Sequence, residues 1–260
     1  MKNYLKFRKQ HWINQVKKNS KYNMNNFILN PYTYLKSKFY VEGSSLLILI
    51  CIKLGVKPNT ITAIYTLLGL IGGILLCIPN DACNVIGVII FFSKGIVDWT
   101  DGGVAKIINQ ISKFGGLFDA WAGRFGHISF IVGLGFYLYA KNNEVYFLFL
   151  LIVLLASYST SIKILNLQLN DIDMLKKKNN IKIIKKISKK VHISLFNKVV
   201  EILKNSFDDR ARSVDLICLL ILINLKFDIL VILNFIFYFI TLRFIVSSAR
   251  DFQQIKTFYK

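Results

Sequence analysis

Long apolar runs, separated by short polar links, account for most of this chain and predict membrane-spanning helices. About twenty consecutive apolar residues are enough for a helix to cross the hydrocarbon core of a bilayer. The pattern predicts six such spans, at roughly 60–78, 83–103, 116–139, 145–165, 213–226 and 228–248. The apolar run at 45–54 is too short to span and predicts an interfacial or re-entrant helix. The predicted fold is an all-α integral membrane protein with about six transmembrane helices and an N-terminal interfacial helix.

The same pattern divides the chain into four parts. Residues 1–56 combine a basic, aromatic N-terminal segment with the interfacial helix, and residues 57–165 hold the first four spans. Residues 213–260 hold the last two spans and a tail. Between them, residues 166–212 mix lysine pairs with apolar residues at helical spacings, which predicts basic amphipathic helices on the cytosolic membrane surface. Alternatively, this segment shields a functional site in the membrane part, binds an anionic acceptor substrate, or is a solvated surface.

Lysine and arginine are unevenly distributed among the links, and this bias orients a membrane protein. The link at 79–82 contains neither residue, whereas the link at 106–113, the segment 166–212 and the C-terminal tail are basic. Basic links stay on the cytosolic side of the membrane. Both chain ends are therefore predicted to face the cytosol, together with the link that follows the second span.

The composition favours a membrane protein over a nucleic-acid-binding protein. Hydrophobic residues make up 54% of the 260 residues, and the formal net charge is +20. Many large apolar residues together with many lysines are typical of a polytopic protein whose basic surfaces meet an anionic lipid bilayer. No nucleic-acid-binding motif is present, so we expect no nucleic-acid partner. The four cysteines have no CxxC spacing and are interpreted as small buried side chains.

Three carboxylates lie in or beside the apolar segments: Asp98, Asp101 and Asp119. Burying a carboxylate in hydrocarbon is costly, so an acid at such depth is a functional candidate by default. Asp98 and Asp101 stand three residues apart and share one helix face. The glycine pairs at 102–103 and 115–116 allow a backbone or ligand to come close. Carboxylates in such surroundings suit hard divalent cations, which commonly bring phosphate oxygens with them. The residues alone therefore predict a membrane site for a metal ion and a phosphate.

The stretch 98–123 (the aspartate stretch), DWTDGGVAKIINQISKFGGLFDAWAG, resembles the signature of the CDP-alcohol phosphatidyltransferases, D-x2-D-G-x2-A-R-x8-G-x3-D-x3-D. The positions that match in identity and spacing are Asp98, Asp101, Gly102, Ala105, Gly115 and Asp119. Two positions depart from the signature, because Lys106 replaces its Arg and Gly123 replaces its fourth Asp. The sequence KPNTIT at 57–62 is similar to a PNxxT sequence of the family. The likeness covers roughly residues 40–165.

This resemblance implies that an acceptor alcohol attacks the β-phosphorus of a CDP-alcohol, takes up the phosphoalcohol group and releases CMP, in phospholipid or related phosphodiester synthesis. It implies that Asp98, Asp101 and Asp119 bind Mg²⁺ or Mn²⁺, which stabilises charge on the phosphoryl oxygens. The substrate-binding positions that it implies are Asn59, Thr62, Gly102, Ala105, Lys106 and Gly115. Lys106 keeps the charge of the expected Arg but loses its two-pronged fork.

Gly123 conflicts with this chemistry, because the fourth Asp of the family is a metal ligand and its general base. In one interpretation His127, one helical turn further along, is the replacement base; a structural role is the alternative for this side chain. In another, the metal-bound geometry suffices, and water or a substrate phosphate takes the proton. In a third, the chain is a catalytically impaired nucleotide-binding relative, either a pseudoenzyme or a partner subunit.

Two rival interpretations concern the aspartate stretch as a whole. The acids are buried for structure and neutralised by lysines, or they mark the ion path of a transporter. A transporter predicts internal repeats, and the sequence contains no second copy of this stretch. We expect as partners a CDP-alcohol donor, an alcohol acceptor, an anionic bilayer and, by resemblance, a second copy in a homodimer. Abundant lysine, asparagine and isoleucine suggest a bacterial source, and hence the inner (plasma) membrane, with the site facing the cytosol.

Overall fold

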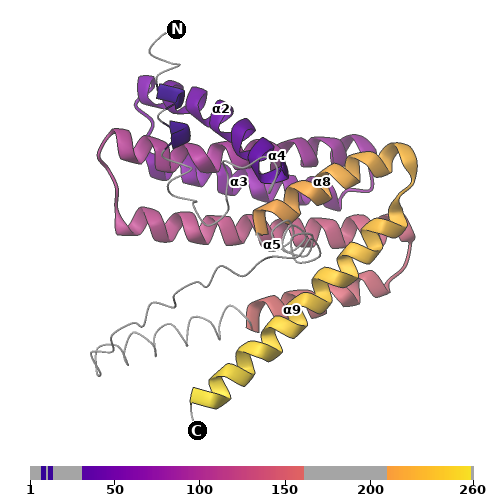
Figure 1. Cartoon of the computed structure of the whole chain (residues 1–260). Coiled ribbons are helices and arrows are strands. Elements are labelled where there is room, and N and C mark those ends of the chain that lie inside the picture. The colour runs from indigo at the N-terminus through magenta and orange to yellow at the C-terminus, as the bar shows by residue number, and fades with distance from the viewer. Residues whose placement is uncertain (1–6, 10, 14–30, 161–209, 259–260) are drawn as a thin grey trace, which may run out of the picture. The chain divides into compact units, whose positions relative to one another are not determined.

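The computed structural model describes residues 7–9, 11–13, 31–160 and 210–258, and their regular structure is entirely helical. Figure 1 labels α2 (Pro31–Lys53), α3 (Pro58–Cys77), α4 (Asp81–Ile107), α5 (Lys113–Asn142), α8 (Arg210–Phe227) and α9 (Leu230–Phe258). A shorter apolar helix, Tyr146–Thr160, follows α5. The chain divides into two compact units, Met1–Tyr137 with Ser194–Asp228, and Leu138–Ile193 with Ile229–Lys260.

The predicted all-α membrane fold is confirmed. Among the described helices, three are long and apolar enough to cross a bilayer: α3, α4 and the part of α9 from Leu230 to Arg250. The number of six crossings stays a prediction, as does the division of the chain into four parts. Residues 14–30 and 161–209 lie outside the described residues, and with them the end of the predicted fourth span and nearly all of the basic segment 166–212.

The helix α4 is longer than the sequence pattern predicts. It continues to Ile107 instead of ending near residue 103, because the residues after the glycine pair sustain a helix. At its end the Ile108 N–H still donates to the Val104 carbonyl, and Asn109 then adopts a left-handed conformation with φ of 54°. Asp98 and Asp101 therefore lie inside the helix rather than at its end, and their backbones are held by its hydrogen bonds.

The helix α5 begins earlier than predicted, at Lys113 instead of Gly116. Ser112 caps this end, because its Oγ accepts a hydrogen bond from the Gly115 N–H at 2.9 Å. Asp119 consequently lies in the second turn of the helix, within the predicted limits. The last helix also departs from its predicted range, 228–248, since α9 continues as far as Phe258.

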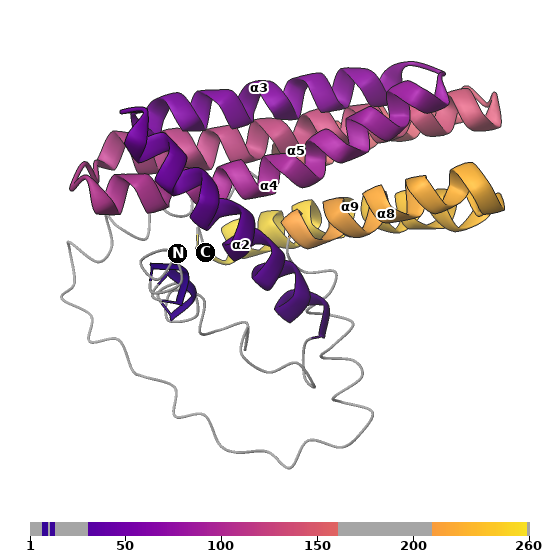
Figure 2. The same ribbon diagram turned by 90° about the horizontal axis from the view of Figure 1, so that it is seen from above.

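In the first unit, α3, α4 and the first part of α5 run alongside one another (Figure 2). Small residues allow their backbones to come close. A Cβ added at Gly73 of α3 would lie 2.6 Å from the Ser129 carbonyl oxygen of α5, and one added at Gly87 of α4 would lie 3.0 Å from the Gly72 carbonyl oxygen. Lipid supplies no hydrophobic driving force between helices, so the van der Waals contacts made at such close approach stabilise their packing.

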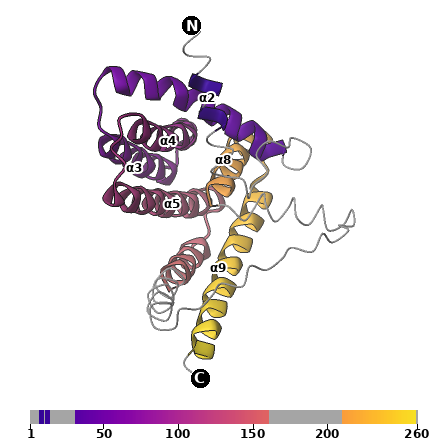
Figure 3. The same cartoon turned by 60° about the vertical axis from the view of Figure 1, so that its left-hand side comes forward.

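The helix α2 crosses α4 in the direction of α8 (Figure 3). Its buried residues recur every three or four positions and form one face: Ser37, Tyr40, Val41, Ser44, Ser45 and Ile48. A buried ion pair ties this face to α8, because Lys36 Nζ lies 2.6 Å from Asp215 Oδ2. The Tyr40 hydroxyl donates to the same carboxylate oxygen at 2.9 Å. The pairing satisfies charges that would otherwise be costly to bury.

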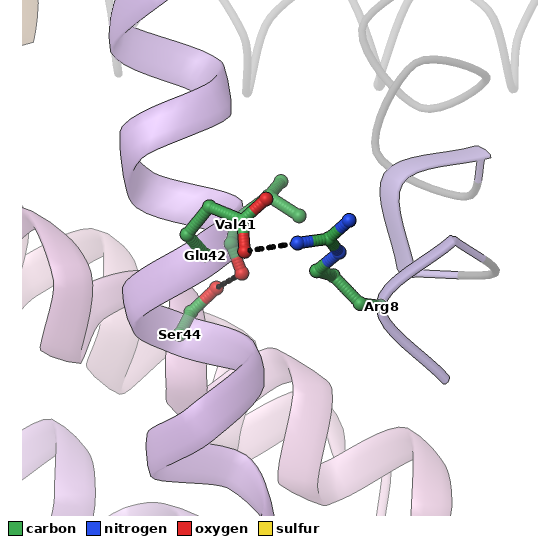
Figure 4. Close-up of polar contacts among 4 residues, drawn as sticks. All are labelled: Arg8, Val41, Glu42 and Ser44. Carbon is green, nitrogen blue, oxygen red and sulfur yellow. Dashed lines mark hydrogen bonds and ion pairs between the residues drawn. The ribbon is translucent and has the colours of Figure 1, made fainter. Parts of the chain in front are cut away.

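The described residues of the N-terminal segment pack on α2 (Figure 4). Arg8 forms an ion pair of 3.0 Å with Glu42. His11 is 7% exposed, and its Nε2 lies 3.2 Å from the Ser44 hydroxyl, which itself donates to the Val41 carbonyl. Burial lowers the pKa of His11, and the nearby Lys106 charge lowers it further, so both favour the neutral imidazole. This places the N-terminal segment beside the cytosolic end of α4 predicted from the sequence.

In the second unit, polar pairs join α9 to the end of α5 and to the helix Tyr146–Thr160. Asn142 and Asn234 exchange two amide hydrogen bonds, of 3.0 Å and 2.8 Å. The Tyr238 hydroxyl donates to the Tyr146 hydroxyl at 2.9 Å, and Thr160 and Ser248 share a hydrogen bond of 2.8 Å. Hydrogen-bonded polar pairs of this kind stabilise the association of helices in lipid.

We expect Gly73→Ala to destabilise the protein, because its Cβ would collide with the backbone of Ser129. Overpacking of this kind costs about 1–3 kcal/mol. Gly116→Ala is the matched control, since a Cβ there meets nothing within 4 Å. Thermal unfolding of the detergent-solubilised protein should show a lower midpoint for Gly73→Ala and an unchanged or higher one for Gly116→Ala. Equal midpoints would contradict the packing of α3 against α5.

Candidate functional site

Two hydroxyl groups on α3 hold two of the predicted site carboxylates. Thr62 and Tyr65 stand three residues apart, so they share one face of the helix, and both are buried. Thr62 Oγ1 donates to Asp101 Oδ2 of α4 at 2.7 Å. The Tyr65 hydroxyl lies 2.7 Å from Asp119 Oδ1 of α5 and 2.8 Å from the Asp119 carbonyl oxygen. One helix face thus links the carboxylates of two other helices.

The third carboxylate belongs to the same region, because the Tyr65 hydroxyl interacts electrostatically with Asp98 as well as with Asp119 and Asp101. Burial of the three differs widely. Asp101 is only 6% exposed, Asp98 is half-buried and Asp119 is exposed. The group therefore extends from the interior of the helix bundle to its surface, so a ligand can approach from the side of Asp119.

The donor chemistry of these side chains fits a hard divalent cation, since carboxylate oxygens are the ligands that Mg²⁺ and Mn²⁺ prefer. The carboxylates are not gathered at one point, however. Among the described residues, no three His, Cys, Asp or Glu side chains lie close enough together to hold a metal ion. Thr62 and Tyr65 donate to one oxygen each of Asp101 and Asp119, and the Gly102 N–H donates to the other oxygen of Asp101.

The predicted substrate-binding positions lie at the same end of the helices. Asn59 is exposed in the first turn of α3, and its Oδ1 lies 3.4 Å from the position of a Cβ added at Gly115 of α5. Gly102 is exposed, and a Cβ there meets nothing within 4 Å. Ala105 is half-buried and Lys106 is exposed in the last turns of α4. This end presents a polar, partly open surface beside the carboxylates.

The position of the missing fourth carboxylate is open. A Cβ added at Gly123 meets nothing within 4 Å, so the backbone has room for a side chain there. His127 lies one turn further along α5 and is half-buried, with both ring nitrogens shielded from solvent. Its placement neither assigns nor excludes the role of a base, which stays a prediction.

Two residues of this region escaped the sequence-based prediction. Tyr65 carries a common aromatic side chain, and its position three residues after Thr62 was the one signal of its role. Lys94 lies one helical turn before Asp98 on α4, and its Nζ is 4.7 Å from the centre of the Tyr65 ring. An ionisable residue inside an apolar span marks a functional candidate, and this signal could have identified Lys94 from the sequence.

Comparison with known protein families identifies the family of this chain. A sequence profile of the family described as CDP-alcohol phosphatidyltransferase matches residues 56–199, which is more than half of the chain. The match includes α3, α4 and α5, and therefore every candidate site residue named above. No curated protein matches the chain.

We expect Thr62→Val to destabilise the protein, because it leaves the buried Asp101 carboxylate without its hydroxyl donor. A hydrogen bond to a charged group contributes about 1.5–3 kcal/mol, and the Gly102 N–H remains as a donor to Asp101. Thr66→Val is the matched control, since the Thr66 hydroxyl donates only to the Thr62 backbone carbonyl. Thermal unfolding in detergent should show the larger loss for Thr62→Val; a larger loss for Thr66→Val would contradict the role of this hydrogen bond.

Proposed function

The chain belongs to the CDP-alcohol phosphatidyltransferase family, and on this basis we propose that it transfers a phosphoalcohol group from a CDP-alcohol to an acceptor hydroxyl and releases CMP. The family transfers phosphoalcohol groups from CDP-alcohol donors to alcohol acceptors in membranes. The observation that carries the proposal is the pair of hydrogen bonds from Thr62 and Tyr65 to Asp101 and Asp119. They connect two side chains of the aspartate stretch, which carries the family signature, to one face of α3.

In this proposal Asp98, Asp101 and Asp119 hold Mg²⁺ or Mn²⁺. The ion, when bound, offsets negative charge on the phosphoryl oxygens. Thr62 and Tyr65 restrain two of these carboxylates before an ion binds. Ion binding then costs less side-chain conformational entropy. Their hydroxyls play the part that outer-shell hydrogen bonds play around metal ligands in general.

The nucleotide lies across the exposed end of α3, α4 and α5. The proposed contact positions are Asn59, Thr62, Gly102, Ala105, Lys106 and Gly115. The space over Gly102 and the closeness of Asn59 to Gly115 support this placement. Lys106 supplies a positive charge at the surface, where a phosphate can reach it.

The proton of the acceptor hydroxyl needs a destination, because Gly123 has no carboxylate. His127 lies one turn beyond Gly123 on α5 and is the first candidate for this role. Water or a substrate phosphate is the alternative acceptor of the proton. A second candidate function follows from Gly123 itself: a relative that binds the nucleotide without turning it over, as a pseudoenzyme or partner subunit.

We further propose a bacterial inner membrane as the location, with both chain ends and the site facing the cytosol. The uneven distribution of lysine and arginine supports this orientation. A cytosolic CDP-alcohol would then reach the exposed side of Asp119 without crossing the membrane. The basic surfaces are proposed to contact anionic lipid, and a homodimer stays a prediction.

The test is CMP release by the purified protein in lipid vesicles, with Mg²⁺ or Mn²⁺ and a panel of CDP-alcohols and acceptors. We expect the native chain to release CMP in the presence of metal and to lose this activity when the metal is chelated. If His127 is the base, His127→Ala should lower the rate by about 10²–10⁴-fold. Asp119→Asn, which removes a proposed ligand at an exposed position, should abolish turnover.

Gly123→Asp separates an active enzyme from an impaired one, and the open space at this position makes it a clean substitution. Gly123→Asn is its control, with the same size and no charge. A silent native chain that becomes active in Gly123→Asp alone would establish the impaired relative. Absence of nucleotide binding in the native chain and in both variants would overturn the proposed function.

A further inference from the structure

The described residues of the N-terminal segment, 7–9 and 11–13 (the strap), contact α4 as well as α2. A Cβ added at Gly103 of α4 would lie 3.6 Å from His11 Cε1. Phe7 packs against a buried cluster with one residue from each of α2, α3 and α4: Ile48, Ile61 and Val104. The strap therefore packs where the site-bearing helices α3 and α4 meet α2.

The contacts on α4 adjoin proposed substrate-binding positions. Gly103 follows Gly102, and Val104 precedes Ala105. All four residues lie in the last turns of α4, where helical hydrogen bonds couple their backbones. Side chains that pack on Gly103 and Val104 consequently restrain their neighbours as well. Docking of the strap thus supports the end of α4 at which the nucleotide is proposed to lie.

His11 is the central contact of the strap. Its imidazole stacks on the Phe7 ring, with ring centres 6.0 Å apart and ring planes 14° from parallel. Its Nε2 lies 3.2 Å from the Ser44 hydroxyl oxygen. The Ser44 hydroxyl donates to the Val41 carbonyl (Figure 4), so the imidazole is the donor of the bond to Ser44. A neutral ring that carries its hydrogen on Nε2 meets this requirement.

Two contacts at the surface add less to docking. Arg8 pairs with Glu42 at 3.0 Å, but both side chains are partly exposed. The Lys38 ammonium group lies 5.1 Å from the centre of the Trp12 ring. Solvent-exposed ion pairs contribute little to stability. The contacts of His11 and Phe7 with buried residues therefore decide whether the strap is docked.

A positive charge on His11 opposes docking. The side chain is 7% exposed, and a protonated ring would carry a second N–H, at Nδ1, into these surroundings. Burial lowers the pKa of His11, and the charge of Lys106 on α4 lowers it further. On α2, the charged residues Glu42 and Lys38 contact other side chains of the strap. Docking is thus coupled to the neutral imidazole.

We propose that the strap positions the site end of α4, and that protonation of His11 releases it. This inference rests on the proposed function for the role of that end of the helix. His11 is a positioning residue, because it acts on the site through α4. Since the docked state disfavours the imidazolium, docking is strongest above about pH 6.5, the ordinary pKa of histidine, and weakens as the pH falls below that value.

The test is hydrogen exchange of the full chain in detergent, followed by mass spectrometry, about one pH unit above and one below the ordinary pKa of histidine. After correction for the intrinsic pH dependence of exchange, amides at residues 102–108 should exchange faster at the lower pH. One proton is coupled to docking, so the increase is at most about tenfold per pH unit. Amides at residues 85–92 of α4 should not respond and are the internal control.

Three variants separate His11 from other titrating groups. His11→Gln keeps a side-chain N–H for Ser44 but cannot be protonated in this range, so exchange at residues 102–108 should stay slow at both pH values. His11→Ala removes the contact, so exchange there should be fast at both. Lys9→Ala, the loss of an exposed strap residue, is the matched control and should respond to pH as the native chain does.

Unchanged exchange in the native chain would overturn the inference, and so would a pH response that persists in His11→Gln. These two comparisons decide the question even if His11→Ala does not fold. CMP release by the native chain should fall more steeply at low pH than release by His11→Gln; equal falls would overturn the positioning role. Failure of the proposed function is separable, because the predicted exchange in a chain that releases no CMP would uphold the strap alone. CMP release without this exchange response would uphold the function alone.

Discussion

The hydrogen bonds that α3 donates to carboxylates on α4 and α5 are the interaction on which the rest of this site depends. A carboxylate buried in a membrane protein is tolerated only when donors or cations satisfy it. Thr62 satisfies Asp101, and Tyr65 satisfies Asp119, from one face of one helix. The bond from Thr62 therefore helps to make the burial of Asp101 possible, and the two bonds together connect the halves of the aspartate stretch, although a turn separates them in the chain.

Close helix packing is the second requirement, and glycine provides it. The contact of Gly73 with the Ser129 backbone keeps α3 and α5 near enough for the Tyr65 hydroxyl to reach Asp119. The glycines at 69 and 126 serve a different purpose, because they make room for the Lys94 side chain between the helices. The small residues that allow α3, α4 and α5 to pack closely therefore also leave space for the charged side chains of the site.

Much of this arrangement was predictable from the sequence, because apolar length defines membrane helices and spacing defines the aspartate stretch. The all-α membrane fold and the family were both predicted correctly. The ends of α4 and α5 were less well predicted, since the left-handed Asn109 and the Ser112 cap, rather than the glycine pairs, set the link between them. Tyr65, Lys36 and Asp215 could not be assigned, because their roles depend on partners distant in the chain. Lys94 was visible as a charge in an apolar segment, but only the structure relates it to the Tyr65 ring.

The central claim is that the three carboxylates form one metal site at the end of α3. Anomalous X-ray scattering from Mn²⁺ in crystals of the protein, grown with a CDP-alcohol, tests it most directly. The account predicts an anomalous peak bounded by Asp98, Asp101 and Asp119, on the side of the exposed Asp119. A peak away from these residues, or none while the nucleotide is visibly bound, would contradict it.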